Sequence, residues 1–152
     1  MVIDLFEHNR TAYEKVCAML AERGQAAVVH PTGTGKSFIA FKLAEDNPSS
    51  RILWLSPSEY IFRTQVENLK RACNVELSNI SFLTYAKLML ADEEAIKEYS
   101  PDYIILDEFH RCGAEMWGKG VERLLSVFPQ PPVFGLSAPN IRYPHHHRAM
   151  AD

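Results

Sequence analysis

The sequence has few cysteines, and none of them lies close to another. Cys17, Cys73 and Cys112 are far apart, and no C-x-x-C pair occurs. An odd, scattered set predicts neither a disulfide framework nor a zinc ribbon, so we expect reduced and mostly buried thiols. The neighbouring His110 and Cys112, and the three histidines 145–147, are too tightly grouped to form a tetrahedral metal site by themselves.

Long apolar runs and a basic N-terminus are also missing. No run approaches the ~20 apolar residues of a membrane-spanning helix. The first residues, MVIDLFEHNR, carry acids where a signal peptide carries positive charge. These absences predict a cytoplasmic protein without a membrane partner. The net charge of -3 predicts that any contact with nucleic acid is local and not spread over the whole surface.

What the sequence does contain is a regular alternation of apolar strand-like segments and helix-like segments. Its 152 residues correspond to one ordinary domain. Strands are predicted at 25–30, 51–56, 80–85, 102–108 and 131–137, and helices at 4–22, 37–46, 57–73, 86–100 and 114–128. Gly24 is expected to end the first helix. Because the strands are continuously apolar, we expect an α/β three-layer sandwich, with a mainly parallel sheet of at least these five strands and helices on both faces.

A glycine-rich loop separates the first strand from the second helix. The phosphate-loop pattern requires Gly, four variable residues and then Gly-Lys-Ser/Thr; here Gly35, Lys36 and Ser37 fill the last three places, while His30 takes the first. Glycines let backbone N–H groups point at phosphate oxygens, and the helix adds its positive N-terminal end. Lys36 is expected to reach the β- and γ-phosphates, and the Ser37 hydroxyl to bind magnesium. The residues expected to hold the nucleotide are Pro31, Thr32, Gly33, Thr34, Gly35, Lys36 and Ser37.

Two adjacent acids, Asp107 and Glu108, follow the apolar stretch YIIL. An aspartate at the end of a buried strand can hold magnesium, and the glutamate beside it can accept a proton from an attacking water. The alternative is a pair of acids in a solvated loop. Together with the glycine-rich loop, the pair favours a site for a nucleotide and Mg²⁺ with a hydrolytic base, in which Lys36, Asp107 and Glu108 are the catalytic residues.

The segments PTGTGKS, DEFH and GLSAP, in this order and at this spacing, resemble the first RecA-like domain of superfamily two DEAD/DEAH-box helicases. The resemblance is greatest to the type III restriction enzyme helicase branch and covers about residues 5–143. It implies a P-loop NTPase fold that binds ATP and Mg²⁺ in one RecA-like domain over residues 1–143, followed by a short polar tail over 144–152. It also implies that His110 couples the nucleotide site to the third motif.

The resemblance further implies contacts with a nucleic acid backbone, either DNA or RNA. The stretch LSPSEYIFRTQ looks like motif Ia, in which Pro57 and the start of the following helix face the polymer. The stretch TYAKL looks like the threonine motif that touches phosphates, which makes Thr84 a candidate contact. The alternative for these residues is a helix cap or a turn hydroxyl.

Three features depart from the family pattern. Pro139 stands in the third place of motif III, where it offers neither a hydroxyl nor an N–H for a hydrogen bond to motif II. Asn9 stands near the position of a glutamine that reads adenine; it is one methylene shorter, with Phe6 or Tyr13 as a stacking partner. The second RecA-like domain, which supplies arginine fingers worth ~10³–10⁵ in rate, is absent. We therefore expect nucleotide binding with weak hydrolysis, and either self-association or a second domain in cis or in trans.

Three functional hypotheses remain open from the sequence. The first is the ATP-binding motor domain of a nucleic-acid helicase or translocase. The second is a non-hydrolysing module that binds nucleic acid or protein, which Pro139 and the missing second domain favour. The third is a small-molecule kinase, which needs an arginine-rich lid that no segment after the loop provides. The intact set of Lys36, Ser37, Asp107 and Glu108 favours the first hypothesis.

Overall fold

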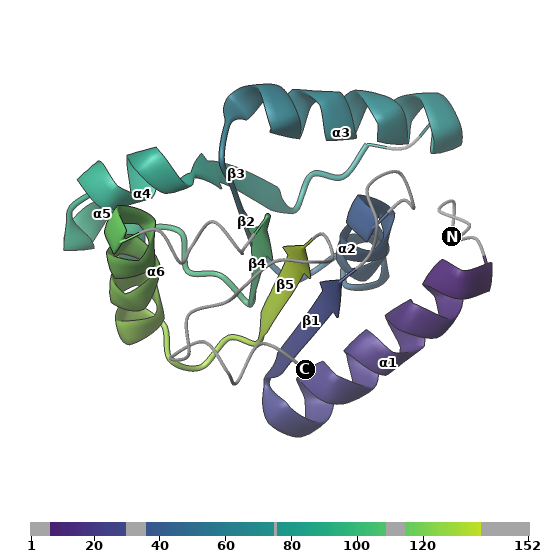
Figure 1. Ribbon diagram of the computed structural model, residues 1–152, viewed down its shortest axis with the longest axis horizontal. Coiled ribbons are helices and arrows are strands. Elements are labelled where there is room, and N and C mark those ends of the chain that lie inside the picture. Colours follow the sequence, from purple (N-terminus) through teal and green to yellow (C-terminus); the bar gives the residue numbers. More distant parts are fainter. Residues whose placement is uncertain (1–6, 30–35, 75, 109–114, 138–152) are drawn as a thin grey trace.

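The computed structural model describes residues 7–29, 36–74, 76–108 and 115–137. Helices and strands alternate along the chain except for two successive helices between β3 and β4, and the strands form one sheet (Figure 1). The elements are α1 (Glu7–Arg23), β1 (Gln25–Val29), α2 (Lys36–Asp46), β2 (Ile52–Ser56), α3 (Glu59–Cys73), β3 (Ile80–Thr84), α4 (Tyr85–Leu90), α5 (Glu93–Lys97), β4 (Tyr103–Asp107), α6 (Glu115–Val127) and β5 (Val133–Ser137).

The sheet has five strands in the order β1-β5-β4-β2-β3, and every pairing is parallel. The predicted parallel α/β sheet is therefore confirmed. Strands β5, β4 and β2 are interior, whereas β1 and β3 are the edges of the sheet as far as the described strands go. Because all strands run in one direction, their carboxyl ends lie along one edge, where ligands of open α/β sheets bind.

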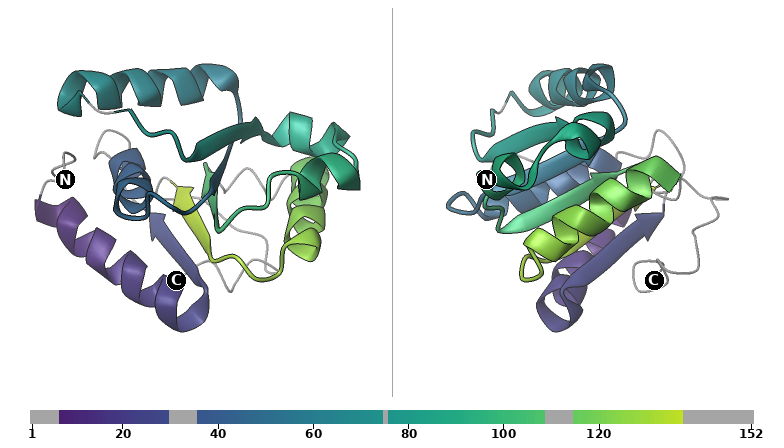
Figure 2. Two further views of the ribbon diagram at one scale, coloured as in Figure 1. Left: turned by 180° about the vertical axis from the view of Figure 1, so that it is seen from behind. Right: turned by 90° about the vertical axis from the view of Figure 1, so that its left-hand side faces the viewer.

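Helices cover both faces of the sheet (Figure 2). One buried cluster joins α1, α2 and α3 to side chains such as Trp54, Ile105 and Phe134. The other joins α4, α5 and α6 to side chains such as Leu53 and Leu106. Neighbouring residues of a strand thus serve opposite layers, as the pleat requires, and both layers are apolar. None of the helices described here is long and apolar enough to cross a membrane.

Two helix ends follow from local residues. Gly24 has a φ of 74° and donates its N–H to the carbonyl of Leu20 at 3.0 Å, which confirms its predicted role at the end of α1. The single helix predicted at 86–100 is wrong, because two helices occupy this stretch. Ala91 is extended, and Asp92 caps α5 by accepting a hydrogen bond from the Ala95 N–H at 2.8 Å. An acid at the cap followed by Glu93 and Glu94 was the signal for a new helix start.

A single amide side chain binds three backbone carbonyls at the end of α2 and in the loop that follows it. Asn79 donates from Nδ2 to the carbonyl oxygens of Ala44, Asn47 and Ser50, at 3.1, 3.0 and 3.1 Å. We expect Asn79→Ala to lower the free energy of unfolding by about 1–3 kcal/mol, because it removes three partly buried hydrogen bonds, although the carbonyls of Ala44 and Asn47 keep a backbone donor. Chemical denaturation measures this loss. The exposed Asn68→Ala on α3 is the control, and equal midpoints for the two variants would contradict the expectation.

Candidate functional site

Three side chains bearing oxygen lie in one row at the carboxyl edge of the sheet. Ser56 pairs with Thr84 across β2 and β3. Leu55 pairs with Leu106, so the next residues, Ser56 and Asp107, are neighbours across β2 and β4. All three side chains are buried. Each lies two positions along its strand from a side chain that packs against α2 and α3, and residues two apart in a strand face the same side of the sheet. The three side chains therefore face the layer formed by α2 and α3. The row therefore lies beneath the helices that cover this side.

Asp107 is fully buried at the end of β4, and two distant residues bind it. Its Oδ2 accepts a hydrogen bond from Nε2 of Gln65 on α3, at 2.8 Å. Its backbone carbonyl accepts one from the Tyr85 hydroxyl at the start of α4, also at 2.8 Å. Sequence reasoning missed both partners. Gln65 was within the quoted motif Ia stretch and Tyr85 followed Thr84, but no local pattern connects either residue with Asp107.

Glu108 has an unusual backbone conformation for a residue with a side chain. Its φ is 53°, in the left-handed region. This conformation costs roughly 1–2 kcal/mol for an L-residue other than glycine, and such strain collects at functional sites, where the surrounding structure maintains it. The Tyr85 hydroxyl binds the peptide group just before this residue. The turn after β4 is thus held by two contacts to Asp107, one to its carboxylate and one to its backbone carbonyl.

Only some of the predicted phosphate-binding residues lie in the part of the chain that the structure describes. Residues 31–35 and His110 lie outside the described residues, as does Pro139. Lys36 is the first residue of α2, and Ser37, which is half-buried, is the second; Asn9 lies in α1. Val28 pairs with Leu136, which pairs with Asp107, so the end of β1 lies two strands from the acidic pair. The first N–H groups of a helix attract anions, and α2 begins at this edge.

The residues present fit a magnesium ion that is completed by phosphate. Among residues 7–29, 36–74, 76–108 and 115–137, no three His, Cys, Asp or Glu side chains gather as a self-contained metal site. Mg²⁺ prefers oxygen ligands and is usually held by one or two carboxylates together with substrate phosphates and water. A buried carboxylate at Asp107 and a hydroxyl at Ser37 are donors of this kind.

The two residues predicted to face nucleic acid both lie at helix starts. Pro57 precedes Ser58, which caps α3 by accepting from the Ile61 N–H at 3.3 Å; Pro57 therefore lies just before the helix. Thr84 caps α4, since its hydroxyl oxygen accepts from the Lys87 N–H at 3.1 Å. The structure thus supports the cap role of Thr84, and its nucleic-acid contact stays a prediction.

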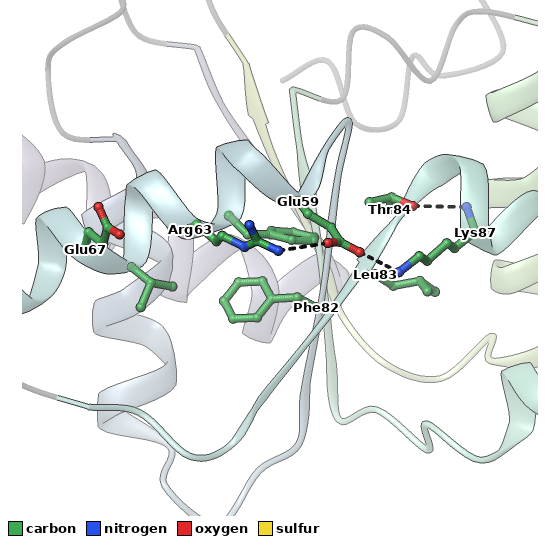
Figure 3. Close-up of a pocket in the computed structure, with 9 residues that line it drawn as sticks. Glu59, Arg63, Glu67, Phe82, Leu83, Thr84 and Lys87 are labelled. Atoms are coloured by element: carbon green, nitrogen blue, oxygen red, sulfur yellow. Dashed lines mark hydrogen bonds and ion pairs between the residues drawn. The ribbon is translucent and has the colours of Figure 1, made fainter.

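An ion-pair bridge joins these two helix starts (Figure 3). Glu59 of α3 lies 2.5 Å from Lys87 Nζ of α4 and 3.3 Å from Arg63, all three being exposed. The hydrogen bond from Lys87, helped by the charges of Lys87 and Arg63, lowers the pKa of Glu59 below its usual value. The bridge borders a cavity of about 430 Å³ lined by apolar side chains such as Phe62 and Phe82. Two cations paired with Glu59 therefore lie near the helix starts that follow Pro57 and Thr84, and sequence reasoning did not single them out.

Tyr13, considered as a stacking partner for adenine, contacts α2. Its hydroxyl lies 2.5 Å from Oδ2 of Asp46, and burial, with this hydrogen bond, raises its pKa above the usual value. Asp46 also pairs with Lys42 at 3.4 Å. Tyr13 thus ties α1 to α2, the helix that follows the glycine-rich loop.

The family model of the type III restriction enzyme res subunit matches residues 2–141. The chain belongs to this family. Comparison with solved structures gives the Hef helicase domain of Pyrococcus furiosus, with a TM-score of 0.67 and 18% identity over 91% of this chain and 34% of that one. The SWI2/SNF2 ATPase core of Sulfolobus solfataricus, determined in complex with dsDNA, gives a TM-score of 0.62 and 13% identity over 91% and 32%. A comparison with curated protein sequences gives no significant match.

These matches confirm the resemblance to the type III restriction enzyme branch and the RecA-like P-loop fold. The chain spans about a third of each matched structure. As a member of the res-subunit family, it is a helicase-like nucleotide-binding domain.

Proposed function

We propose that this res-subunit domain binds ATP with Mg²⁺ and is the ATP-binding motor domain of a DNA or RNA helicase or translocase. The observation that supports this most is the acidic turn after β4. A fully buried Asp107 is followed by Glu108 at positive φ, at the carboxyl edge of the sheet where α2 begins. Burial of a carboxylate is costly unless a cation or a polar network meets it, and a bound metal ion would do so.

Each residue of the site has a specific role in this proposal. Ser37 and Asp107 hold Mg²⁺, Lys36 contacts the β- and γ-phosphates, and Glu108 accepts the proton of the attacking water. When bound, Mg²⁺ neutralises the charge that develops on the phosphate oxygens. The polymer backbone is contacted near Pro57 and Thr84, where Arg63 and Lys87, both exposed and paired with Glu59, offer cations that can exchange this carboxylate for phosphates.

A second RecA-like domain completes the site in this proposal, either in cis or in trans. The matched structures are about three times as long as the part this chain covers. An arginine supplied by such a domain is worth ~10³–10⁵ in rate, so hydrolysis by the 152-residue chain alone is expected to be slow.

Calorimetry with Lys36→Ala tests the proposal. We expect ATP and ADP to bind the unaltered chain in the presence of Mg²⁺, and the substitution to weaken binding at least about tenfold, because it removes a charge-assisted phosphate contact. Lys97→Ala, an exposed change in α5 on the opposite layer, is the matched control and is expected to bind as the unaltered chain does.

Binding that is equally strong in both lysine variants would overturn the assignment of Lys36. If the unaltered chain binds no nucleotide but binds single-stranded nucleic acid in the same cell, the non-hydrolysing binding module replaces the motor domain as the function. The salt dependence of that binding would report the phosphate contacts.

A further inference from the structure

Gln65 occupies a position in α3 where its sequence neighbours predict an apolar side chain. It lies three residues after Phe62 and four before Leu69, both of which are buried against the sheet. Residues at these spacings share one face of a helix. An amide on such a face loses its hydration, and an aliphatic residue would pack there without that cost. Gln65 is half-buried and directs Nε2 to Oδ2 of Asp107, at 2.8 Å.

The orientation of this amide follows from its partner. A carboxylate accepts and does not donate, so the Nε2 end must face Asp107. The other end, Oε1, is buried and has no hydrogen-bond partner within the described part of the chain. The Gln65 amide therefore donates to the Asp107 carboxylate through Nε2, and its acceptor Oε1 lies beside that contact.

Tyr85 acts on the backbone of the same turn. Its side chain is fully buried, and its hydroxyl donates to the carbonyl of Asp107 at 2.8 Å. That carbonyl belongs to the peptide unit that leads into Glu108, whose φ is 53°. A hydrogen bond to this group fixes the plane of the peptide, which helps to maintain a strained backbone.

We infer that Gln65 and Tyr85 are positioning residues of the nucleotide site: Gln65 orients the Asp107 carboxylate toward Mg²⁺, and Tyr85 holds the peptide that orients Glu108. The inference rests on the proposed function. Gln65 belongs to the helix that follows Pro57, and Tyr85 follows Thr84 directly. Each of the two segments predicted to face nucleic acid thus carries one of the two contacts that hold the acidic turn.

The first test compares nucleotide binding with and without metal. Gln65→Met keeps the length of the side chain and removes the donor. Calorimetry with ADP is expected to show affinity about tenfold lower in Mg²⁺ and unchanged within about twofold in excess EDTA, because a hydrogen bond to a charged metal ligand is lost. Asn68→Met, an exposed change on the same helix, is the control. A structural role alone would lower both affinities together, and that result would overturn the inference.

The second test needs no nucleotide. Amide hydrogen exchange of residues 103–108 is measured on the 152-residue chain and on Tyr85→Phe and Gln65→Met, with the exposed Tyr60→Phe as control. We expect exchange at the Glu108 amide to quicken about fivefold in Tyr85→Phe, while the melting temperature falls by only about a few degrees, because one buried hydrogen bond is lost and the ring stays in place. If exchange is unchanged in both variants, the inference is overturned even if ATP binds. If exchange quickens but the chain binds no nucleotide, the result counts against the proposed function alone.

Discussion

Trp54→Ala is expected to lower the free energy of unfolding by about 3–5 kcal/mol. Trp54 is fully buried in β2, an interior strand between β3 and β4. Its ring centroid lies 4.8 Å from that of Phe41 on α2 and 5.8 Å from that of Phe82 on β3, so it connects the sheet to the helix that follows the glycine-rich loop. A typical domain is stable by only ~5–15 kcal/mol, and a loss of this size leaves little margin.

Urea denaturation followed by circular dichroism measures this change, and Trp54→Phe is the matched control. The indole Nε1 is buried without a hydrogen-bond partner among the residues described, so phenylalanine keeps most of the packing and removes an unsatisfied donor. We expect Trp54→Phe to cost less than half as much as alanine. An alanine variant as stable as the unaltered chain would mean that the two aromatic contacts do not support the core.

Glu108→Gln is expected to slow ATP hydrolysis by about 10²–10⁴, because the amide cannot accept the proton of the attacking water. Nucleotide affinity is expected to stay within about twofold, since Lys36, Ser37 and Asp107 are untouched. Glutamine has the same shape as glutamate, and the conformational free energy of holding it at positive φ is the same. Single-turnover measurements with protein in excess over labelled ATP are suited to the slow hydrolysis expected of the chain alone.

The control for this change is Glu94→Gln, which alters an exposed glutamate in the first turn of α5. It is expected to hydrolyse ATP at the unaltered rate, and both variants should melt within a few degrees of the unaltered chain. Hydrolysis at the full rate in Glu108→Gln would place the base elsewhere and remove the main reason for assigning catalysis to the turn after β4.

The strands were predictable because each is a short apolar run with polar or glycine-containing segments on both sides. The predicted strand at 51–56 became β2 at Ile52–Ser56, and the other four strands lie within their predicted ranges in the same way. Strand order was not predicted, because parallel pairings such as Gln25 with Val133 join residues that no local pattern relates. The break between α4 and α5 was missed because apolar periodicity outweighed the capping signal at Asp92.

The site was predictable to the extent that its chemistry is local. Gly-Lys-Ser at the start of a helix and Asp-Glu at the end of a strand are local signals, so these residues could be named from the sequence, and their roles stay predictions. Gln65 and Tyr85 were not predictable as partners of Asp107, because tertiary packing alone brings α3 and α4 to the end of β4. The three carbonyl contacts of Asn79 were not predictable either, because tertiary packing brings them together.

The position of β1 in the sheet has a consequence for synthesis of the chain on the ribosome. Of the described strands, β1 pairs only with β5, which is also the strand that separates β1 from β4. β1 can therefore join the sheet only after β5 has been made, and closing so long a loop makes folding slow. Until residues 133–137 emerge, β1 and one side of β4 have exposed backbone groups that can pair wrongly with other chains. The ends of β1 and β4 therefore come together only when β5 is inserted between them.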